Sequence, residues 1–539
     1  MMLQIALRQG RGGLVATTAI AAFNGIAQSL GYAAIAGHSP ATRAAFAAQM
    51  ELVGRQLTFL LPVPAQVETV AGFLQWRHFG TLPLVYGVWA LLAAAGAARG
   101  DEERGHVEQW LAAGLSRARY LVSRVAVFAL LATVSAAATC GATLLGTAWA
   151  GDALPLAGLV AQGIALVALS VCCYAIALVV TQFAVTGRTA AGIGAAVLGA
   201  LFLIAGAARS GGFEGVAPLS PFWQYERSRP LITGGSLDPT SVMWLFGVAL
   251  LGTAGAVVLF ARRDLGSSAL PRRVSRAAPV RDPARRITLR LPVIAGIDRQ
   301  ATGLIAWSIG LSALGIFLGS LLPTMIRLAK EVPIIRVIVL RGGSGDLDAA
   351  FVGAVWGSSA LLVLSSYVIA QVAAWAADES EGRLEMALSA PIPRWRIVLE
   401  RIATLTVGAS FLVLVASVIV GTATRAQGLS VDLAKFAAAS ALLVPPVVTC
   451  GAIGAVLIGW RPRAAVWLLG LVIVASYFIQ QLAPMFGFND LIRHLSLFEL
   501  YGTPLLDGPN WRGLAIQVAI IAVGFGTALF SMSRRDIAR

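Results

Sequence analysis

Long apolar segments alternate with short polar segments along the whole chain. A run of about 20 predominantly apolar residues is long enough to cross a lipid bilayer as an α-helix. The pattern predicts twelve such spans in two sets of six, at 13–36, 79–98, 122–149, 157–185, 189–208 and 241–261, and then at 301–325, 352–376, 399–423, 436–459, 464–483 and 512–532. The predicted fold class is therefore an all-α integral membrane protein.

A charged loop follows the second span of each set. Its first copy runs from Asp101 to Arg124, and its second copy, from Asp378 to Arg401, lies 277 positions later without a gap. Nine of these 24 positions hold the same residue, whereas chance would give about one or two matches. The identical pairs are Asp101/Asp378, Glu102/Glu379, Gly105/Gly382, Glu108/Glu385, Leu111/Leu388, Ala113/Ala390, Arg117/Arg394, Arg119/Arg396 and Arg124/Arg401.

Two further motifs recur at nearly the same separation. Arg262-Arg263-Asp264 after the sixth span returns as Arg534-Arg535-Asp536 after the twelfth. A Leu-Ser-x-Phe-x-x-Tyr segment precedes the last span of each set, with Leu219, Ser220, Phe222 and Tyr225 in the first and Leu495, Ser496, Phe498 and Tyr501 in the second. The same order and spacing across a whole half indicate a tandem duplication.

Arginines gather at the ends of the predicted spans on one side. Both charged loops and both termini lie on this side, which the positive-inside rule makes cytoplasmic. Each half contains an even number of spans, so the two halves have the same orientation. We expect a first six-span half at 1–262, a basic cytoplasmic linker at 263–300, and a second six-span half at 301–539.

Composition supports a membrane protein. The 539 residues are 58% hydrophobic and only 12% charged, against about 25% charged in soluble domains. A net charge of +15 would suggest nucleic acid as the partner of a soluble protein. Here the arginines flank apolar spans, so we interpret the charge as a topology signal and predict no nucleic-acid partner.

No catalytic or cofactor site can be assembled from the sequence. The chain contains no Gly-x-x-x-x-Gly-Lys-Ser/Thr loop for a nucleotide phosphate, no zinc-protease motif and no nucleophile elbow. Its four cysteines and four histidines do not have metal-ligand spacing. The predicted spans lack ionisable residues away from their ends, although proton- or ion-coupled carriers need such groups. We therefore predict a non-enzymatic chain whose driving energy comes from outside the bilayer.

The duplicated loop predicts a short amphipathic helix. Apolar residues recur every four positions, at Val107, Leu111 and Leu115 and again at Leu384, Leu388 and Ile392. The carboxylates of Glu102, Glu108, Glu379 and Glu385 should then face water or a partner. Gly105 and Gly382 permit a change of direction, and Arg117 and Arg394 lie where lipid headgroup phosphates are expected. Ordinary positive-inside flanking is the alternative; it explains the arginines but not the paired carboxylates and glycines.

Each half resembles the ABC-2 type permease, the membrane subunit of one class of ATP-binding-cassette exporter. The resemblance rests on Glu379–Leu388 followed by Pro391-Ile392-Pro393-Arg394; the first copy has Gly114-Leu115-Ser116 in place of the Pro-Ile-Pro turn. The fused twelve-span form resembles bacterial polyketide-antibiotic and multidrug exporters. The resemblance implies a bacterial plasma-membrane permease that exports hydrophobic or amphipathic compounds.

The resemblance also assigns partners and site residues. Two copies of a separate ATP-binding subunit, which hold ATP and Mg, would dock on the two loops as coupling helices. The residues concerned are Glu102, Gly105, Glu108, Leu111, Arg117, Glu379, Gly382, Glu385, Leu388 and Arg394. The two Leu-Ser-x-Phe-x-x-Tyr segments would form external re-entrant hairpins.

A central cleft would offer polar groups without fixed charge to the substrate. Five amide side chains in the spans could line it or could instead join helices by hydrogen bonds: Asn24, Gln28, Gln182, Gln480 and Gln481. Two other function classes stay open. A twelve-span secondary carrier is disfavoured by the uncharged spans, and a polytopic membrane enzyme by the lack of a recognisable carboxylate pair among Glu51, Glu68, Asp346 and Asp348.

Overall fold

The computed structural model describes the chain except for residues 1, 57, 60, 210, 212–214, 270–291, 332–345, 381, 390–391, 430, 487–488, 490–492, 494 and 535–539. The described residues form helices, turns and loops without a strand, which confirms the predicted all-α class. The chain divides into two compact units, Met1–Ala277 and Ala278–Arg539. The division falls within the segment 263–300 that the sequence predicts as a linker.

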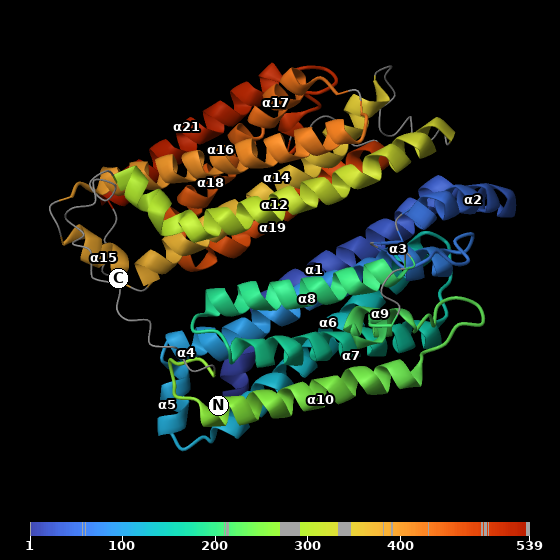
Figure 1. Ribbon diagram of the computed structural model, residues 1–539, viewed down its shortest axis with the longest axis horizontal. Coiled ribbons are helices and arrows are strands. Elements are labelled where there is room, and N and C mark those ends of the chain that lie inside the picture. Colours follow the sequence, from blue (N-terminus) through green and yellow to red (C-terminus); the bar gives the residue numbers. More distant parts are fainter. Residues whose placement is uncertain are drawn as a thin grey trace. The chain divides into compact units, whose positions relative to one another are not determined.

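The first unit is a bundle of long helices with short surface helices at both ends (Figure 1). Helix α1 packs along α6, while α3 and α10 both pack on α7. The elements are α1 (Met2–Ala36), α2 (Pro40–Gln56), α3 (Val70–Ala95), η1 (Gly96–Gly100), α4 (Asp101–Glu103), α5 (His106–Ala112), α6 (Arg117–Trp149), α7 (Leu156–Thr181), α8 (Gly187–Arg209), η2 (Ala217–Leu219), α9 (Pro221–Glu226) and α10 (Pro239–Arg262). The short helices α4 and α5 lie at one end of this bundle, and α2 and α9 at the other.

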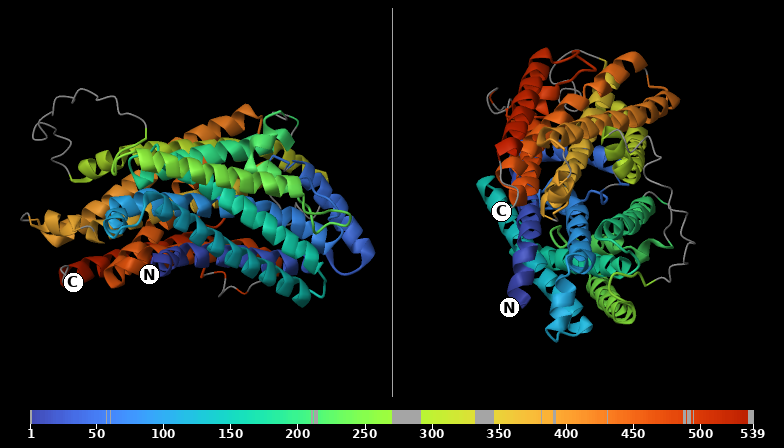
Figure 2. Two further views of the ribbon diagram at one scale, coloured as in Figure 1. Left: turned by 90° about the horizontal axis from the view of Figure 1, so that it is seen from below. Right: turned by 90° about the vertical axis from the view of Figure 1, so that its left-hand side faces the viewer.

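The second unit is also built of helices, coloured from yellow to red in Figure 2. Helix α12 packs along α16, and α21 packs on α18. The elements are α12 (Pro292–Glu331), α14 (Leu347–Ser380), α15 (Arg383–Leu388), α16 (Arg394–Ala426), α17 (Leu433–Ala441), α18 (Val444–Trp460), α19 (Pro462–Phe486), η4 (Glu499–Tyr501) and α21 (Trp511–Arg534). We call the end of each unit that carries its charged loop the loop end.

Helix bounds recur at the separation found in the sequence. Adding 277 to the bounds of α6 gives those of α16, and adding 277 to the start of α3 at Val70 gives the start of α14 at Leu347. The separation between α10 and α21 is 272 positions at both ends. Adding 277 to the bounds of α7 gives 433–458, a range that α17 and α18 together cover. The second unit has two helices in this range because Pro445 and Pro446 lack the amide hydrogens that would continue α17.

Ten described helices are long and apolar enough to cross a membrane. They match ten of the twelve predicted spans. The two remaining predicted spans, 301–325 and 464–483, lie in α12 and α19, where the described apolar stretches Gly303–Ile316 and Ala464–Gln480 are shorter. The structure therefore establishes a multi-pass helical protein, and the count of twelve spans stays a prediction.

Helix α3 begins nine residues before the predicted span and includes a histidine. His78 is fully buried. Its Nδ1 lies 3.0 Å from Asn24 Nδ2 on α1, and its Nε2 lies 3.2 Å from Thr143 Oγ1 on α6. The expectation that the spans lack ionisable residues away from their ends is therefore wrong for α3. A buried imidazole is tolerated here because both ring nitrogens have partners.

Candidate functional site

In both charged loops a glycine sets the direction of the chain. Gly105 precedes α5 with φ +72°, and Gly382 precedes α15 with φ +72°. Other L-residues pay about 1–2 kcal/mol in this left-handed conformation. Each glycine therefore lets the chain leave a long helix and start a short one along the loop end, as the sequence predicts.

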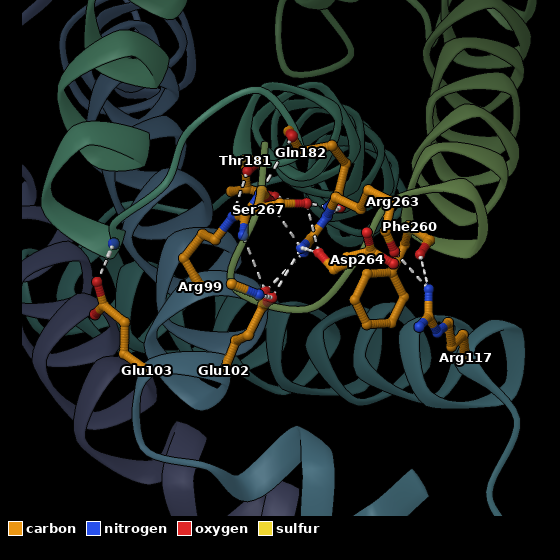
Figure 3. Close-up of polar contacts among 12 residues, drawn as sticks. Arg99, Glu102, Glu103, Arg117, Thr181, Gln182, Phe260, Arg263, Asp264 and Ser267 are labelled. Carbon is orange, nitrogen blue, oxygen red and sulfur yellow. Dashed lines mark hydrogen bonds and ion pairs between the residues drawn. The ribbon is translucent and has the colours of Figure 1, made fainter. Parts of the chain in front are cut away.

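The carboxylate of Glu102 lies at the centre of a buried ion cluster in the first loop (Figure 3). It accepts hydrogen bonds from Arg263 Nη2 at 2.7 Å, Arg99 Nη1 at 3.2 Å and the amide of Gly266 at 2.6 Å. Only 7% of Glu102 is exposed. The expectation that Glu102 faces water or a partner is therefore wrong, because Arg99, three residues earlier, and Arg263, 161 residues later, enclose it.

The same cluster joins the ends of several helices. Arg99, in η1 directly after α3, donates to the carbonyls of Thr181 at 2.9 Å and Ser267 at 2.8 Å. Arg263, after α10, donates through Nε to Gln182 Oε1 at 2.9 Å. These contacts, drawn in Figure 3, fix the ends of α3, α7 and α10 and the first residues after α10 to one another. We call Arg99, Glu102, Gln182 and Arg263 the buried ion cluster.

A second acidic residue anchors each loop to the helix that follows. Asp101 Oδ2 accepts from Arg124 Nη2 at 2.5 Å, with Tyr120 OH at 3.0 Å. In the second unit Asp378 Oδ2 accepts from Arg401 Nη2 at 3.2 Å. These pairs occupy positions 277 apart in the sequence. Both loops are thus held against the helix after them by the same ion pair.

Arg117 and Arg394 each bind the end of a helix in their own unit. Arg117 Nη1 donates to the carbonyls of Phe260 at 3.0 Å and Arg263 at 2.6 Å, at the end of α10. Arg394 Nη1 donates to the carbonyl of Met532 at 3.3 Å, near the end of α21. The last carbonyls of a helix lack intrahelical partners and favour a cation. These arginines therefore cap α10 and α21, and their predicted contact with headgroup phosphates stays a prediction.

The short helices α5 and α15 each have one buried and one exposed side. Val107 and Leu384 are buried, at 0% and 4% exposure, and attach the helices to their units. Leu111 and Leu388 are half-buried, whereas Glu108 and Glu385 are exposed. The amphipathic pattern is confirmed. A partner could reach Glu108 and Glu385, whereas Glu379 is half-buried.

The two Leu-Ser-x-Phe-x-x-Tyr segments make similar contacts. In each, the serine donates to a helix carbonyl: Ser220 to Leu201 at 2.8 Å, and Ser496 to Ser476 at 2.7 Å. Phe222, Tyr225, Phe498 and Tyr501 are buried, and Leu219 and Leu495 are exposed. The tyrosine hydroxyls reach α7 and α17, where Tyr225 OH accepts from Gln162 and Tyr501 OH donates to Ala439. In the first unit this segment lies at the end opposite the loop end.

The amides proposed to line a cleft have mostly structural partners. Asn24 contacts His78, and Gln182 belongs to the buried ion cluster. Gln480 Nε2 donates to the carbonyl of Phe498 at 3.4 Å, and Gln28 is half-buried. The side chain of Gln481 lies outside the described part of the structure. Hydrogen bonding within the bundle is therefore the observed role for three of the five.

Sequence reasoning missed Arg99 and Arg263 as partners of Glu102. In the sequence both arginines look like ordinary charge at the end of a span. The signal that could have found Arg263 is that both members of the pair recur in the second half, Arg263 as Arg535 and Glu102 as Glu379. No such signal existed for Arg99, because Ala376 stands at the corresponding position.

Comparisons with known proteins agree with a transport role. The chain is 26% identical over 480 residues to the multidrug efflux system permease protein Rv1217c of Mycobacterium tuberculosis (strain ATCC 25618 / H37Rv), covering 86% of this chain and 81% of that protein. A family model described as the C-terminal domain of the multidrug efflux system permease Rv1217c matches residues 3–261 and 289–532. This indicates a membrane transport component rather than an enzyme. The chain belongs to the Rv1217c family of multidrug efflux system permeases.

Proposed function

We propose that this chain is the membrane permease of an ATP-driven ABC-2 type exporter. Two copies of a separate ATP-binding subunit would dock on α5 and α15, and these subunits would hold ATP and Mg. The observation that carries the proposal is the pair of exposed glutamates, Glu108 and Glu385, on short helices fixed to their units by corresponding contacts. Duplicated docking surfaces suit a pair of ATPase subunits.

The anchoring of the loops explains how a push from outside would reach the bundle. A force on α5 passes through Asp101 to Arg124 on α6, and through Glu102 to Arg99 and Arg263. A loosely tethered loop would absorb such a force by moving alone. In our proposal, ATP-driven closure of the partner subunits displaces α3, α6 and α10 together and alternates access to a path through the protein.

The substrates in this proposal are hydrophobic or amphipathic compounds, moved out of the cytoplasm or the inner leaflet. The name of the curated relative, a multidrug efflux system permease, supports this class. The recurring helix bounds support two parallel six-helix repeats with twelve spans in all. The bacterial plasma membrane is the proposed location.

Cysteine labelling tests the proposed orientation, with both loops and both termini cytoplasmic. All four native cysteines are buried, so background labelling by a membrane-impermeant maleimide should be low. Ala113→Cys and Ala387→Cys, at exposed loop positions, should react only after the membrane is permeabilised. Leu219 is 63% exposed, so Leu219→Cys should react in intact cells. The reverse labelling pattern would invert the topology and exclude docking of cytoplasmic subunits on these loops.

A secondary carrier is the second candidate, and His78 is the observation that favours it. A titratable group inside a span could in principle carry a proton. If the exporter proposal holds, vanadate should stop substrate efflux from cells. Efflux should then persist when a protonophore collapses the proton gradient. A polytopic membrane enzyme would show neither behaviour. Efflux that stops with the protonophore while ATP is maintained would instead establish the carrier.

A further inference from the structure

The second unit contains a break in a helix that is continuous in the first unit. Helix α17 ends at Ala441 and α18 begins at Val444, inside a stretch long and apolar enough to cross a membrane. Pro445 and Pro446 have no amide hydrogen to donate to the carbonyls four residues earlier, those of Ala441 and Leu442. In the part of the chain that the structure describes, no other backbone amide donates to these two carbonyls. Such carbonyls in a transmembrane helix need donors from neighbouring helices.

Helix α21 carries a polar side chain at the level of this break. Two contacting pairs show how α18 and α21 lie against each other, Ala452 with Gly524 and Gly459 with Ser531. The residues of each pair are 72 positions apart, so the two helices run parallel and in step. Seven residues earlier, which is about two helical turns, the same separation pairs Pro445 with Gln517.

The corresponding contact in the first unit gives the same placement. There the buried Leu245 of α10 packs on Ala168 and Cys172 of α7. The separations found above, 272 positions for α10 and 277 for α7, lead from these residues to their counterparts in the second unit, Gln517, Pro445 and Thr449. An apolar contact with a continuous helix is thus replaced by a glutamine beside a broken one.

The side-chain amide of Gln517 is buried without an acceptor. Only 2% of Gln517 is exposed, and none of the described atoms accepts a hydrogen bond from its Nε2. Leaving a buried donor unpaired is unfavourable. A helical carbonyl points towards the residue four positions later, so the carbonyl of Ala441 points to the level of Pro445 and Gln517. A donor and an acceptor that both lack partners therefore lie at one level of two neighbouring helices.

Other side chains hold the end of α17 in the structure. Tyr501 OH donates to the carbonyl of Ala439 at 3.0 Å, and Trp356 Nε1 donates to Ser440 Oγ at 3.3 Å. Tyr501 lies in η4 and Trp356 in α14, so neither belongs to α21. A helix can change direction at a proline break. Helix α17 therefore has one set of partners that it uses and a second that it leaves unpaired.

We propose that the turn at Leu442 and Leu443 is a hinge with two positions of α17. In the second position α17 gives up its bond from Tyr501, and Gln517 donates to the carbonyl of Ala441 instead. Helix α18 stays packed on α21, so only the short helix moves. The hinge belongs to the second unit alone, because α7 has no break. Two alternative sets of hydrogen bonds make it a two-state element.

Distances between spin labels test the hinge in the full chain in phosphatidylcholine nanodiscs, without an ATP-binding subunit. Double electron–electron resonance is measured between Ala434→Cys on α17 and Val518→Cys on α21. The matched pair of the first unit is Ala157→Cys on α7 and Phe246→Cys on α10. All four positions are exposed, and the native cysteines are buried. The second unit should give two distances and the first unit one. A single distance in the second unit, as a fixed water molecule between Gln517 and the carbonyl would produce, would overturn the proposal.

Variants with opposite expected effects identify the side chains that hold each position. Gln517→Leu introduces the leucine that the first unit has at this place and should remove the second distance. Tyr501→Phe should raise the population at the second distance about fivefold relative to the first, the effect of losing one ordinary hydrogen bond. Gln480→Leu, at a buried glutamine of α19, is the matched control and should leave both distances as in the wild type. A second distance that persists in Gln517→Leu would exclude Gln517 from the hinge.

The prolines give an independent variant. Pro445→Ala/Pro446→Leu introduces the residues that continuous α7 has at these positions, Ala168 and Leu169, and should leave a single distance. Two distances in this variant would contradict the hinge, whether or not Gln517→Leu folds. These measurements use neither ATP nor a partner subunit, so failure of the hinge is distinct from failure of the proposed function.

Discussion

Glu102→Ala is expected to destabilise the first unit by about 3–5 kcal/mol, the usual cost of removing one member of a buried ion pair. The side chains of Arg99 and Arg263 are only 1% and 2% exposed. Without the carboxylate, two guanidiniums would face each other in a region that water does not reach. Thermal unfolding in nanodiscs, followed at matched protein concentration, measures the loss as a lower melting temperature and a lower yield.

The neighbouring carboxylate gives the control for this prediction. Glu103 is exposed and accepts a single bond, from the amide of Gly187 at 2.9 Å. Glu103→Ala should therefore cost only about 1 kcal/mol, as the loss of a helix cap does. The double variant Glu102→Ala/Arg99→Ala should recover part of the stability, because one uncompensated charge is gone. Equal melting temperatures for the two single variants would show that the buried ion cluster contributes little.

Apolar length and repetition made the framework predictable. A long run without charge has few alternatives to a membrane helix, since every backbone polar group must be satisfied inside the span. The recurring spacing placed the two loops and the short helices α5 and α15, and Gly105 and Gly382 adopt the left-handed conformation that glycine favours. These features depend on residues close together in the chain, so the sequence contains enough information to predict them.

The roles of the individual charges could not be predicted in the same way. Glu102 and Glu108 are the same residue type in the same loop, yet one is buried and the other exposed. The difference comes from Arg263, 161 positions away, which the fold brings beside Glu102. Hydropathy also placed the start of a span after His78, because a single sequence does not show that Asn24 and Thr143 supply its hydrogen bonds.

Duplication also concealed a difference between the halves. The matched positions of the two loops suggested equivalent sites. The residues that fill the first loop end, Arg99 and Gln182, lie outside the matched set and have the small counterparts Ala376 and Gly459. Equal motifs are therefore accompanied by different side chains at these positions of the two units. Stability effects should accordingly be larger for Glu102 than for Glu379.

The Glu108→Ala/Glu385→Ala double variant is expected to lose ATPase docking while keeping its fold. Both side chains are exposed, and surface substitutions usually change stability by no more than about 0.5 kcal/mol. Truncating a charge that becomes buried and bonded in an interface costs about 2–5 kcal/mol of binding, which at the upper end is a loss of roughly three to four orders of magnitude in affinity. The measurements are the melting temperature, co-purification with the ATP-binding subunit, and substrate-stimulated ATPase activity at matched membrane expression.

Glu51→Ala on α2, an exposed carboxylate at the other end of the first unit, controls for the change of charge and should assemble normally. Glu385→Ala alone should have the larger effect of the two single variants, because its loop carries the Pro-Ile-Pro turn that resembles the ABC-2 permeases. If the double variant assembled fully and hydrolysed ATP in response to substrate, Glu108 and Glu385 would have no part in coupling, and the docking surface would have to be sought elsewhere on the loop ends.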